Sequence, residues 1–268
     1  MMDEFNATKL DEIRDKISES RKVQKTCITV CGGTGCHAYG CLKVAEAFKD
    51  EIKKQNLQDL IDVRITGCHG FCERGPITVI QPKGIFYQRI QLKDIKEVIS
   101  ETIIKKNIVK RLLYTEPRTK EKIVYEKEVP FYKKQQRIIL GNNGFIDPTD
   151  INDYIALDGY KALVKVLFDM TSEEVIADIK ASGLRGRGGA GFLTGKKWGI
   201  CREGISDVKY IICNADEGDP GAYMDRSLLE GNPHSVIEGM IIGAYAIGAS
   251  LGFIYVRMEY PLAVKNAT

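Results

Sequence analysis

The residues of this chain with the plainest chemical potential are its eight cysteines. Six of them lie within the first 72 of 268 residues, and four form two close pairs, Cys31 with Cys36 and Cys68 with Cys72. Residues 1–20 are charged and contain no apolar core, which is unlike a signal peptide and predicts a cytoplasmic protein. Thiols clustered in a reducing compartment indicate a metal site rather than disulfides.

Both cysteine pairs follow predicted strands. The first pair follows a β-rich stretch over Thr26–Val30, and the second follows an alternating stretch over Ile61–Thr66. If the strands are parallel, both loops lie at one edge of the sheet, where the four sulfurs can meet. The glycines between the cysteines let backbone N–H groups point at sulfur, and such hydrogen bonds help to set the potential of an iron–sulfur cluster.

Structural zinc is the competing interpretation, but zinc prefers tighter pairs such as C-x2-C around one ion. A Rieske centre would use His37 and His69. Each of these histidines adjoins a cysteine, and adjacent side chains diverge, so we expect loop packing or solvent exposure for both. Cys27 and Cys41 are expected to be small buried hydrophobic residues.

A second group of candidate residues is a glycine loop. Residues Gly186–Gly191 match the pattern G-x-G-x-x-G, within a stretch that has five glycines in the nine residues 183–191. The loop follows a predicted helix, Ser172–Ala181, whereas the Rossmann version follows a strand. We therefore expect a phosphate-cradling loop of non-Rossmann type, in which glycine allows close approach of the backbone to a cofactor.

An acidic turn over Asn214–Gly221 follows a predicted buried strand, Tyr210–Cys213. Its three carboxylates and one amide can bind the hydroxyl groups of a ribityl or ribose chain. They could also bind a hard cation, but the sequence shows no further acidic ligand nearby, so the metal interpretation is the weaker one.

The elements around the cysteines predict a small α/β domain of the thioredoxin-like kind over residues 1–106. Its expected helices are Lys9–Arg21, Tyr39–Lys54 and Leu92–Lys106, and its expected hairpin joins Ile77–Ile80 to Ile85–Tyr87. Residues 107–137 are expected to be a basic linker, or a strap lying over a partner. Between Glu101 and Arg137 the sequence has eleven basic and five acidic residues.

A second domain is predicted over residues 138–268. It has expected helices at Tyr160–Phe168 and Ser235–Ile247, a capping box that begins at Thr171, and a strand at Phe253–Arg257. The uncharged stretch 239–256 contains four glycines and favours a buried helix and strand over a membrane span. A net charge of +3 with 44% hydrophobic and 28% charged residues excludes a disordered chain and gives no sign of a nucleic-acid partner.

These motifs resemble two known families. VCGGTGCHAYG…GCHGFCERGP is similar to the thioredoxin-like [2Fe–2S] ferredoxin domain of respiratory complex I and soluble hydrogenases. SGLRGRGGAGFLTGKKW and CNADEGDPGAYMDR resemble the FMN- and NADH-binding flavoprotein subunit of complex I, and NADEGDPG looks closest to the flavin subunits of NAD(P)-linked, electron-bifurcating hydrogenases and related formate dehydrogenases. The implied fold class is α/β, with an N-terminal thioredoxin-like [2Fe–2S] domain followed by the N-terminal part of a non-classical α/β FMN-binding domain.

The resemblance implies roles for specific residues. One [2Fe–2S] cluster would be ligated by Cys31, Cys36, Cys68 and Cys72. The positions that match FMN-binding residues are Gly186, Gly188, Lys197, Asn214, Asp216 and Glu217. The positions that match contacts to the nicotinamide nucleotide are Gly189, Phe192 and Asp219. Two positions depart from the family pattern, since Asp219 is usually Glu in complex I members and Leu193 replaces a usual Pro.

The implied function is that of an iron–sulfur flavoprotein subunit of a soluble NAD(P)H-linked oxidoreductase, within a multi-subunit complex that has other iron–sulfur subunits. Hydride transfer between NAD(P)H and FMN requires no catalytic side chain, because the protein only orients the cofactors. Family members continue well beyond the last residue here, so the expected FMN-binding domain is incomplete. The chain alone is therefore expected to bind FMN weakly or not at all and to lack NADH dehydrogenase activity. Two alternatives stay open, namely a [2Fe–2S] electron carrier with an inert flavin domain and a zinc-binding interaction module.

Overall fold

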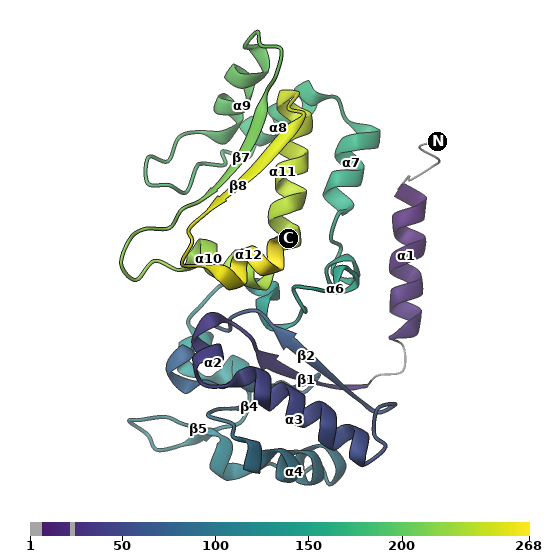
Figure 1. Cartoon of the computed structure of the whole chain (residues 1–268), viewed down its shortest axis with the longest axis vertical. Coiled ribbons are helices and arrows are strands. Elements are labelled where there is room, and N and C mark those ends of the chain that lie inside the picture. The colour runs from purple at the N-terminus through teal and green to yellow at the C-terminus, as the bar shows by residue number, and fades with distance from the viewer. Residues whose placement is uncertain (1–6, 22–24) are drawn as a thin grey trace. The chain divides into compact units, whose positions relative to one another are not determined.

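The computed structural model describes residues 7–21 and 25–268 (Figure 1). The chain forms two compact units, each assembled from segments that lie far apart in the sequence. The cysteine-loop unit contains Ser20–Asp153, Arg226–Pro233 and Leu262–Thr268. The glycine-loop unit contains Tyr154–Asp225, His234–Pro261 and the described residues up to Glu19. The predicted boundaries at residues 106 and 137 stay predictions.

A four-stranded sheet in the order β2-β1-β3-β4 forms the centre of the cysteine-loop unit. Strands β1 (Thr26–Cys31) and β2 (Ile61–Thr66) are parallel, and Cys31 pairs in register with Thr66. Strands β3 (Thr78–Gln81) and β4 (Ile85–Tyr87) form the predicted hairpin, and β3 runs antiparallel to β1. Both strands that precede the cysteine pairs therefore end at the same edge of the sheet, as predicted.

Helix α3 (Cys41–Lys54) packs against this sheet through side chains at helical spacing, among them the buried Phe48 and Ile52. It begins two residues later than predicted. Gly40 adopts φ 79° and separates it from the short helix α2 (Thr34–Ala38). The helix expected over residues 92–106 consists of a 3-10 turn, α4 (Ile95–Glu97) and a wide π-helical turn that ends at Ile104.

Residues 107–137, here called the strap, pack on the cysteine-loop unit itself. The strap contains β5 (Tyr114–Thr115), β6 (Lys122–Ile123) and α5 (Pro130–Lys133). Its apolar side chains join the core of the sheet, and six of them are buried, namely Val109, Leu112, Leu113, Tyr114, Val129 and Tyr132. Burial of these side chains anchors the strap along its length.

The glycine-loop unit is mainly helical, and its strands β7 (Tyr210–Ala215) and β8 (Leu251–Val256) are parallel. Its other helices are α1 (Ala7–Ser20), α7 (Lys161–Asp169), α8 (Ser172–Ala181), α9 (Thr194–Glu203) and α11 (Pro233–Ile247). Helix α6 (Ile151–Ala156) is divided between the two units, and most residues of α10 (Met224–Gly231) and α12 (Pro261–Ala267) belong to the cysteine-loop unit. The predicted capping box is present, since Thr171 and Glu174 exchange hydrogen bonds at the start of α8. Leu10 of α1 packs with Ile155 and Val164 in a small core of its own.

The prediction that both strands of this unit are buried was wrong. Within residues 7–21 and 25–268, side chains cover one face of the β7–β8 sheet, where Ile211 lies against Gly243 of α11. The opposite face exposes Ile212 at 62%, Phe253 at 55% and Tyr255 at 61%. None of the helices that the structure describes is long and apolar enough to cross a membrane.

Candidate functional site

The four predicted cluster cysteines gather at the edge of the sheet where β1 and β2 end. Cys31 is the last residue of β1, Cys36 lies on α2, and Cys68 and Cys72 lie on the loop that follows β2. Cys31 and Cys36 are each 1% exposed. Because the two strands are parallel and in register, a strand end and a loop 37 residues further along the chain meet at one place.

The four thiols form a linear series of pairwise contacts in the order Cys36, Cys31, Cys68 and Cys72. The Sγ atoms of Cys68 and Cys72 are 3.7 Å apart. Cys31 lies within hydrogen-bonding reach of both Cys36 and Cys68. The contacts are pairwise, and within residues 7–21 and 25–268 no group of three or more His, Cys, Asp or Glu side chains is placed so that it could hold a metal ion. Ligation of one cluster by all four sulfurs therefore stays a prediction.

The surroundings of the sulfurs fit an iron–sulfur site. The backbone N–H of Gly70 donates to the Sγ of Cys68 at 3.3 Å, and the backbone N–H of His69 lies within reach of Cys31. A Cβ atom added at Gly75 would lie 2.8 Å from the Sγ of Cys36, so only glycine leaves room for this sulfur. N–H donors aimed at sulfur are the means by which proteins tune such clusters.

Hydrogen bonds among the thiols raise the pKa of three of them. The hydrogen bond with Cys31, followed by burial, raises the pKa of Cys68 to about 11. The hydrogen bond with Cys36 raises the pKa of Cys31, and the one with Cys68 raises the pKa of Cys72. Thiolate ligation must therefore displace protons, and metal uptake is expected to weaken as the pH falls.

The other two cysteines near the sheet are separate from this group. Cys41 is fully buried on α3, as predicted. Cys27 is only half-buried, and its neighbours are the charged side chains of Arg64, Asp62 and Asp153; burial raises its pKa to about 12.

His69 lies between two cluster cysteines and is held by groups on both sides of its ring. It is 1% exposed, its Nδ1 lies 2.7 Å from the Oε1 of Glu126, and its Nε2 lies 3.1 Å from the Oγ1 of Thr66. Burial raises the pKa of Glu126, but the charge and hydrogen bond of His69, together with Arg137, outweigh burial and lower it overall. His69 is thus a packing residue of the loop, in line with the loop-packing interpretation.

A distant segment of the chain also contacts the first cysteine loop. Glu230 is 3% exposed, and its carboxylate accepts hydrogen bonds from the backbone N–H of Thr34 at 3.1 Å and from the Thr34 hydroxyl. Asn143 is fully buried, and its side-chain amide donates to the Ser227 carbonyl at 2.8 Å. Residues 226–233 are therefore part of the unit that carries the cysteines.

The predicted glycine loop connects α8 to α9 as a closed, hairpin-like turn. The backbone N–H of Gly186 donates to the carbonyl of Phe192, and that of Thr194 donates to the carbonyl of Leu184, both at 2.9 Å. Gly189, at the tip, has φ 98°, and a Cβ added there would meet no atom within 4 Å. The loop backbone is thus open to a ligand, and its conformation requires glycine.

A hollow of about 460 Å³ lies at this loop, lined by Ser182, Gly183, Leu184, Arg185, Gly186, Arg187 and Gly191. Lys197 is exposed on α9, Phe192 is 49% exposed, and the Lys196 ammonium lies 5.9 Å from the centre of the Phe192 ring. Glycine N–H groups with neighbouring cations suit a phosphate, and an exposed aromatic face suits a nucleotide ring. This arrangement fits the phosphate-binding role that the sequence predicts.

The carboxylates of the acidic turn differ in exposure and in their hydrogen bonds. Asp216 and Asp219 are exposed, and the side chain of Asn214 accepts a hydrogen bond from the Asp216 backbone. Glu217 accepts a hydrogen bond from the backbone N–H of Asp225 at 3.1 Å, and its carbonyl accepts one from Arg257. Glu217 therefore also stabilises the turn, which the sequence did not indicate. In the view of Figure 1 the turn and the glycine loop project on the same side of β7.

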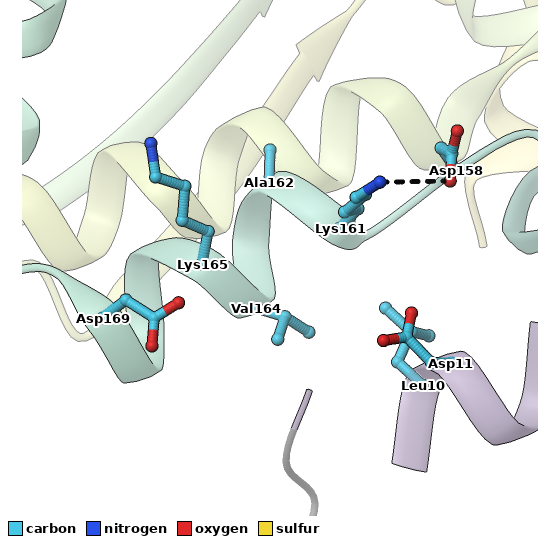
Figure 2. Close-up of a pocket in the computed structure, with 8 residues that line it drawn as sticks. All are labelled: Leu10, Asp11, Asp158, Lys161, Ala162, Val164, Lys165 and Asp169. Atoms are coloured by element: carbon cyan, nitrogen blue, oxygen red, sulfur yellow. Dashed lines mark ion pairs between the residues drawn. The ribbon is translucent and has the colours of Figure 1, made fainter. Parts of the chain in front are cut away.

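A second hollow, of about 540 Å³, lies between α1 and α7 and contains none of the predicted site residues (Figure 2). Its lining mixes both charges, and Lys161 pairs with Asp158 at 3.7 Å. The sequence missed a different group of residues, those that hold the cysteine loops: Thr66, Glu126, Arg137, Asn143 and Glu230. The only signal of this group in the sequence is His69 itself, a histidine inside a cysteine pair.

Two family matches cover separate parts of the chain. Residues 17–103 match the thioredoxin-like [2Fe-2S] ferredoxins, and residues 179–268 match the Nuo51 FMN-binding domain. The matches confirm the predicted fold class and the order of the two domains. They also place the four cluster cysteines in the first match and the glycine loop and acidic turn in the second.

Relatives with assigned functions are similar over about half of the chain. The NADP-reducing hydrogenase subunit HndC of Solidesulfovibrio fructosivorans is 63% identical over 134 residues, which are 50% of this chain and 27% of that protein. An NADH-quinone oxidoreductase subunit of Rhizobium meliloti (strain 1021) is 44% identical over 129 residues, which are 48% of this chain and 31% of that protein. Among solved structures, an NAD+-reducing [NiFe]-hydrogenase matches with a TM-score of 0.40 and 23% identity, over 98% of this chain and 45% of that chain. The aligned part of the chain spans less than a third of the length of either relative named here.

Proposed function

We propose that this chain, which joins a thioredoxin-like [2Fe–2S] ferredoxin domain to a Nuo51 FMN-binding domain, is an iron–sulfur flavoprotein subunit of an NAD(P)H-linked oxidoreductase. The observation that carries the proposal is the meeting of the Cys31–Cys36 and Cys68–Cys72 pairs at one edge of the sheet. The partners would be the other iron–sulfur subunits of a multi-subunit complex, as the names of the relatives suggest.

In the cysteine-loop unit, the four thiols would hold the cluster. The two backbone N–H donors on the second loop would set its potential, and burial of Cys31 and Cys36 would keep water from the sulfurs. A cluster held in this way accepts and releases one electron at a time. No side chain of the unit needs to transfer a proton for this step.

In the glycine-loop unit, the chain's contribution is to bind and orient. Gly186, Gly188 and Lys197 would face the phosphate of FMN, and Asn214, Asp216 and Glu217 would face its hydroxyl chain. Gly189, Phe192 and Asp219 would contact the nicotinamide nucleotide. When bound, FMN exchanges a hydride with the nicotinamide and passes electrons singly to iron–sulfur centres.

Anaerobic reconstitution of the purified chain with ferrous iron and sulfide tests the proposal. We expect about two irons and two sulfides per chain, with the visible absorbance of a [2Fe–2S] cluster. FMN titrated into the chain is expected to bind only weakly, with partial quenching of flavin fluorescence, because residues 182–190 of the glycine loop are all exposed to water. A chain that takes up the cluster but no FMN would be an electron-carrier module with an inert flavin domain. A chain that takes up zinc and no cluster would be an interaction module.

A further inference from the structure

The strap contacts the second cysteine loop, residues 67–72, through three of its side chains. Glu126 contacts the ring of His69 at 2.7 Å, and the Arg137 guanidinium donates to the His69 carbonyl at 2.5 Å. The Phe131 ring stacks on Phe71 with centroids 4.6 Å apart and an interplanar angle of 6°. Three contacts from one segment to one short loop fix the path of its backbone.

The imidazole ring of His69 has almost no freedom to move. An ionised carboxylate only accepts hydrogen bonds, so the His69 Nδ1–H donates to Glu126 and the ring is oriented by that bond. The opposite ring nitrogen is within 3.1 Å of the Thr66 hydroxyl, and a Cβ added at Gly144 would lie 2.9 Å from the ring. The ring therefore ties the peptide of the loop to the strap on one side and to the end of β2 on the other.

That peptide is the one that faces the cysteines. The backbone N–H of Gly70 donates to the Sγ of Cys68 at 3.3 Å, and the preceding N–H, that of His69, lies within reach of Cys31. Both donors lie within one residue of the ring that Glu126 holds. A small rotation of this peptide would turn both N–H groups away from sulfur.

We infer that Glu126 is a positioning residue for the [2Fe–2S] cluster: by orienting His69 from 57 residues away, it keeps the two N–H donors of the second loop aimed at the ligand sulfurs. The inference rests on the proposed cluster function. It assigns the strap, expected from the sequence to be a linker, to the cluster site. Hydrogen bonds to sulfur stabilise the reduced, more negative form, so their loss lowers the midpoint potential.

Two substitutions of the same residue separate positioning from charge. Glu126→Gln removes the charge but keeps an oxygen that accepts from the His69 Nδ1–H, whereas Glu126→Ala removes both. The matched control is Glu128→Ala, an exposed carboxylate on the same turn of the strap. The full chain of each variant is reconstituted, its midpoint potential is measured by redox titration, and its visible circular dichroism is recorded.

We expect Glu126→Ala to have a lower potential than Glu126→Gln, with about a tenfold shift of the reduction equilibrium, which is about 59 mV for one electron. Its visible dichroism is expected to change as well, while Glu126→Gln and Glu128→Ala keep the wild-type dichroism. If the Gln and Ala variants share one potential and one spectrum, only the charge matters and the positioning role is wrong, while the proposed function stands. If Glu126→Ala does not fold, unchanged potential and dichroism in Glu126→Asp, whose shorter side chain withdraws the carboxylate from the His69 Nδ1, overturn the role equally. A wild-type chain that binds no cluster would overturn the proposed function and this inference with it.

Discussion

The cysteine loops and the glycine loop both depend on glycine, but for opposite reasons. At the cysteine loops the neighbours leave no space, and a Cβ at Gly75 would lie 2.8 Å from a ligand sulfur. At the glycine loop the backbone is open to solvent, since a Cβ at Gly189 would meet no atom within 4 Å. In the first case glycine allows protein groups to pack against one another. In the second it leaves the backbone uncovered and allows a positive φ.

The same contrast holds for the surrounding side chains. Cys31 and Cys36 are each 1% exposed, whereas all of residues 182–190 are exposed and Phe192 is 49% exposed. The cysteine loops are held by distant parts of the chain, through Glu126 and Glu230. The first site is thus organised before its cofactor arrives, while the second must be ordered in part by the ligand it binds, which costs affinity.

The largest effect is expected from removing one ligand at the organised site. Cys36→Ala should abolish the cluster, because three thiolates leave one iron coordination position open. Iron and sulfide per chain, measured after anaerobic reconstitution, should fall from about two each to none. Cys41→Ala is the matched control, since Cys41 is as buried as Cys36 but lies on α3, outside the thiol chain. Equal loss of iron in both variants would refute the ligand assignment.

The next largest effect tests the crowding directly. Gly75→Ala would place a methyl group against the Cys36 sulfur, and overpacking of this kind costs about 1–3 kcal/mol of unfolding free energy. We expect a lower midpoint in urea unfolding and a cluster that is lost faster to a chelator. Gly141→Ala lies in the same unit, where an added Cβ meets nothing within 4 Å, and should change neither. A Gly75→Ala chain as stable as wild type would show that the site can accommodate a methyl group beside the Cys36 sulfur.

The sequence predicted the elements that local patterns determine. Alternating and helical apolar spacing identified β1, β2, the β3–β4 hairpin and α8, because each of these buries one face against a nearby element. The glycines and paired cysteines identified the loops, because their chemistry is carried by residue type and spacing. The exposed face of β7–β8 could not be foreseen, since Tyr210, Ile212 and Phe253 are residues that usually lie inside a sheet.

What the sequence could not show is which distant groups hold the loops. The apolar residues of the strap follow no helical or strand period, so its packing on the sheet left no local pattern. Glu126 meets His69 across 57 residues and Glu230 meets Thr34 across 196, and one carboxylate among 36 acidic residues carries no signal of its partner. Pairings of this kind are set by the tertiary fold alone.

At the open site, the matching glycine substitution should act on the ligand and not on the fold. Gly189→Ala strains a φ of 98° and puts a methyl group on the backbone where the nicotinamide nucleotide would lie. We expect NADH affinity, measured by the change in NADH fluorescence, to weaken about tenfold, with little change in the far-ultraviolet dichroism. Gly239→Ala, on the exposed side of α11 in the same unit, is the control and should bind NADH like wild type. Unchanged binding by Gly189→Ala would remove this residue from the nucleotide site.

The smallest effect is expected from pH, and it should appear only at the organised site. The pKa of Glu126 is lowered in the folded chain, where the charge and hydrogen bond of His69 together with Arg137 outweigh burial. A carboxyl group whose folded pKa lies below its unfolded value, about 4.3 for Glu, stabilises the fold fully above that value. This stability is lost as the pH falls toward the lower, folded pKa. We therefore compare the free energy of unfolding of the cluster-free chain, measured in urea between about pH 7 and pH 3. It should fall more steeply with decreasing pH in the wild type than in Glu126→Gln, which has no group to protonate at this position. Glu128→Gln, exposed on the same turn, should follow the wild-type curve, and a Glu126→Gln curve with the wild-type slope would show that this carboxylate gains nothing from its buried contacts.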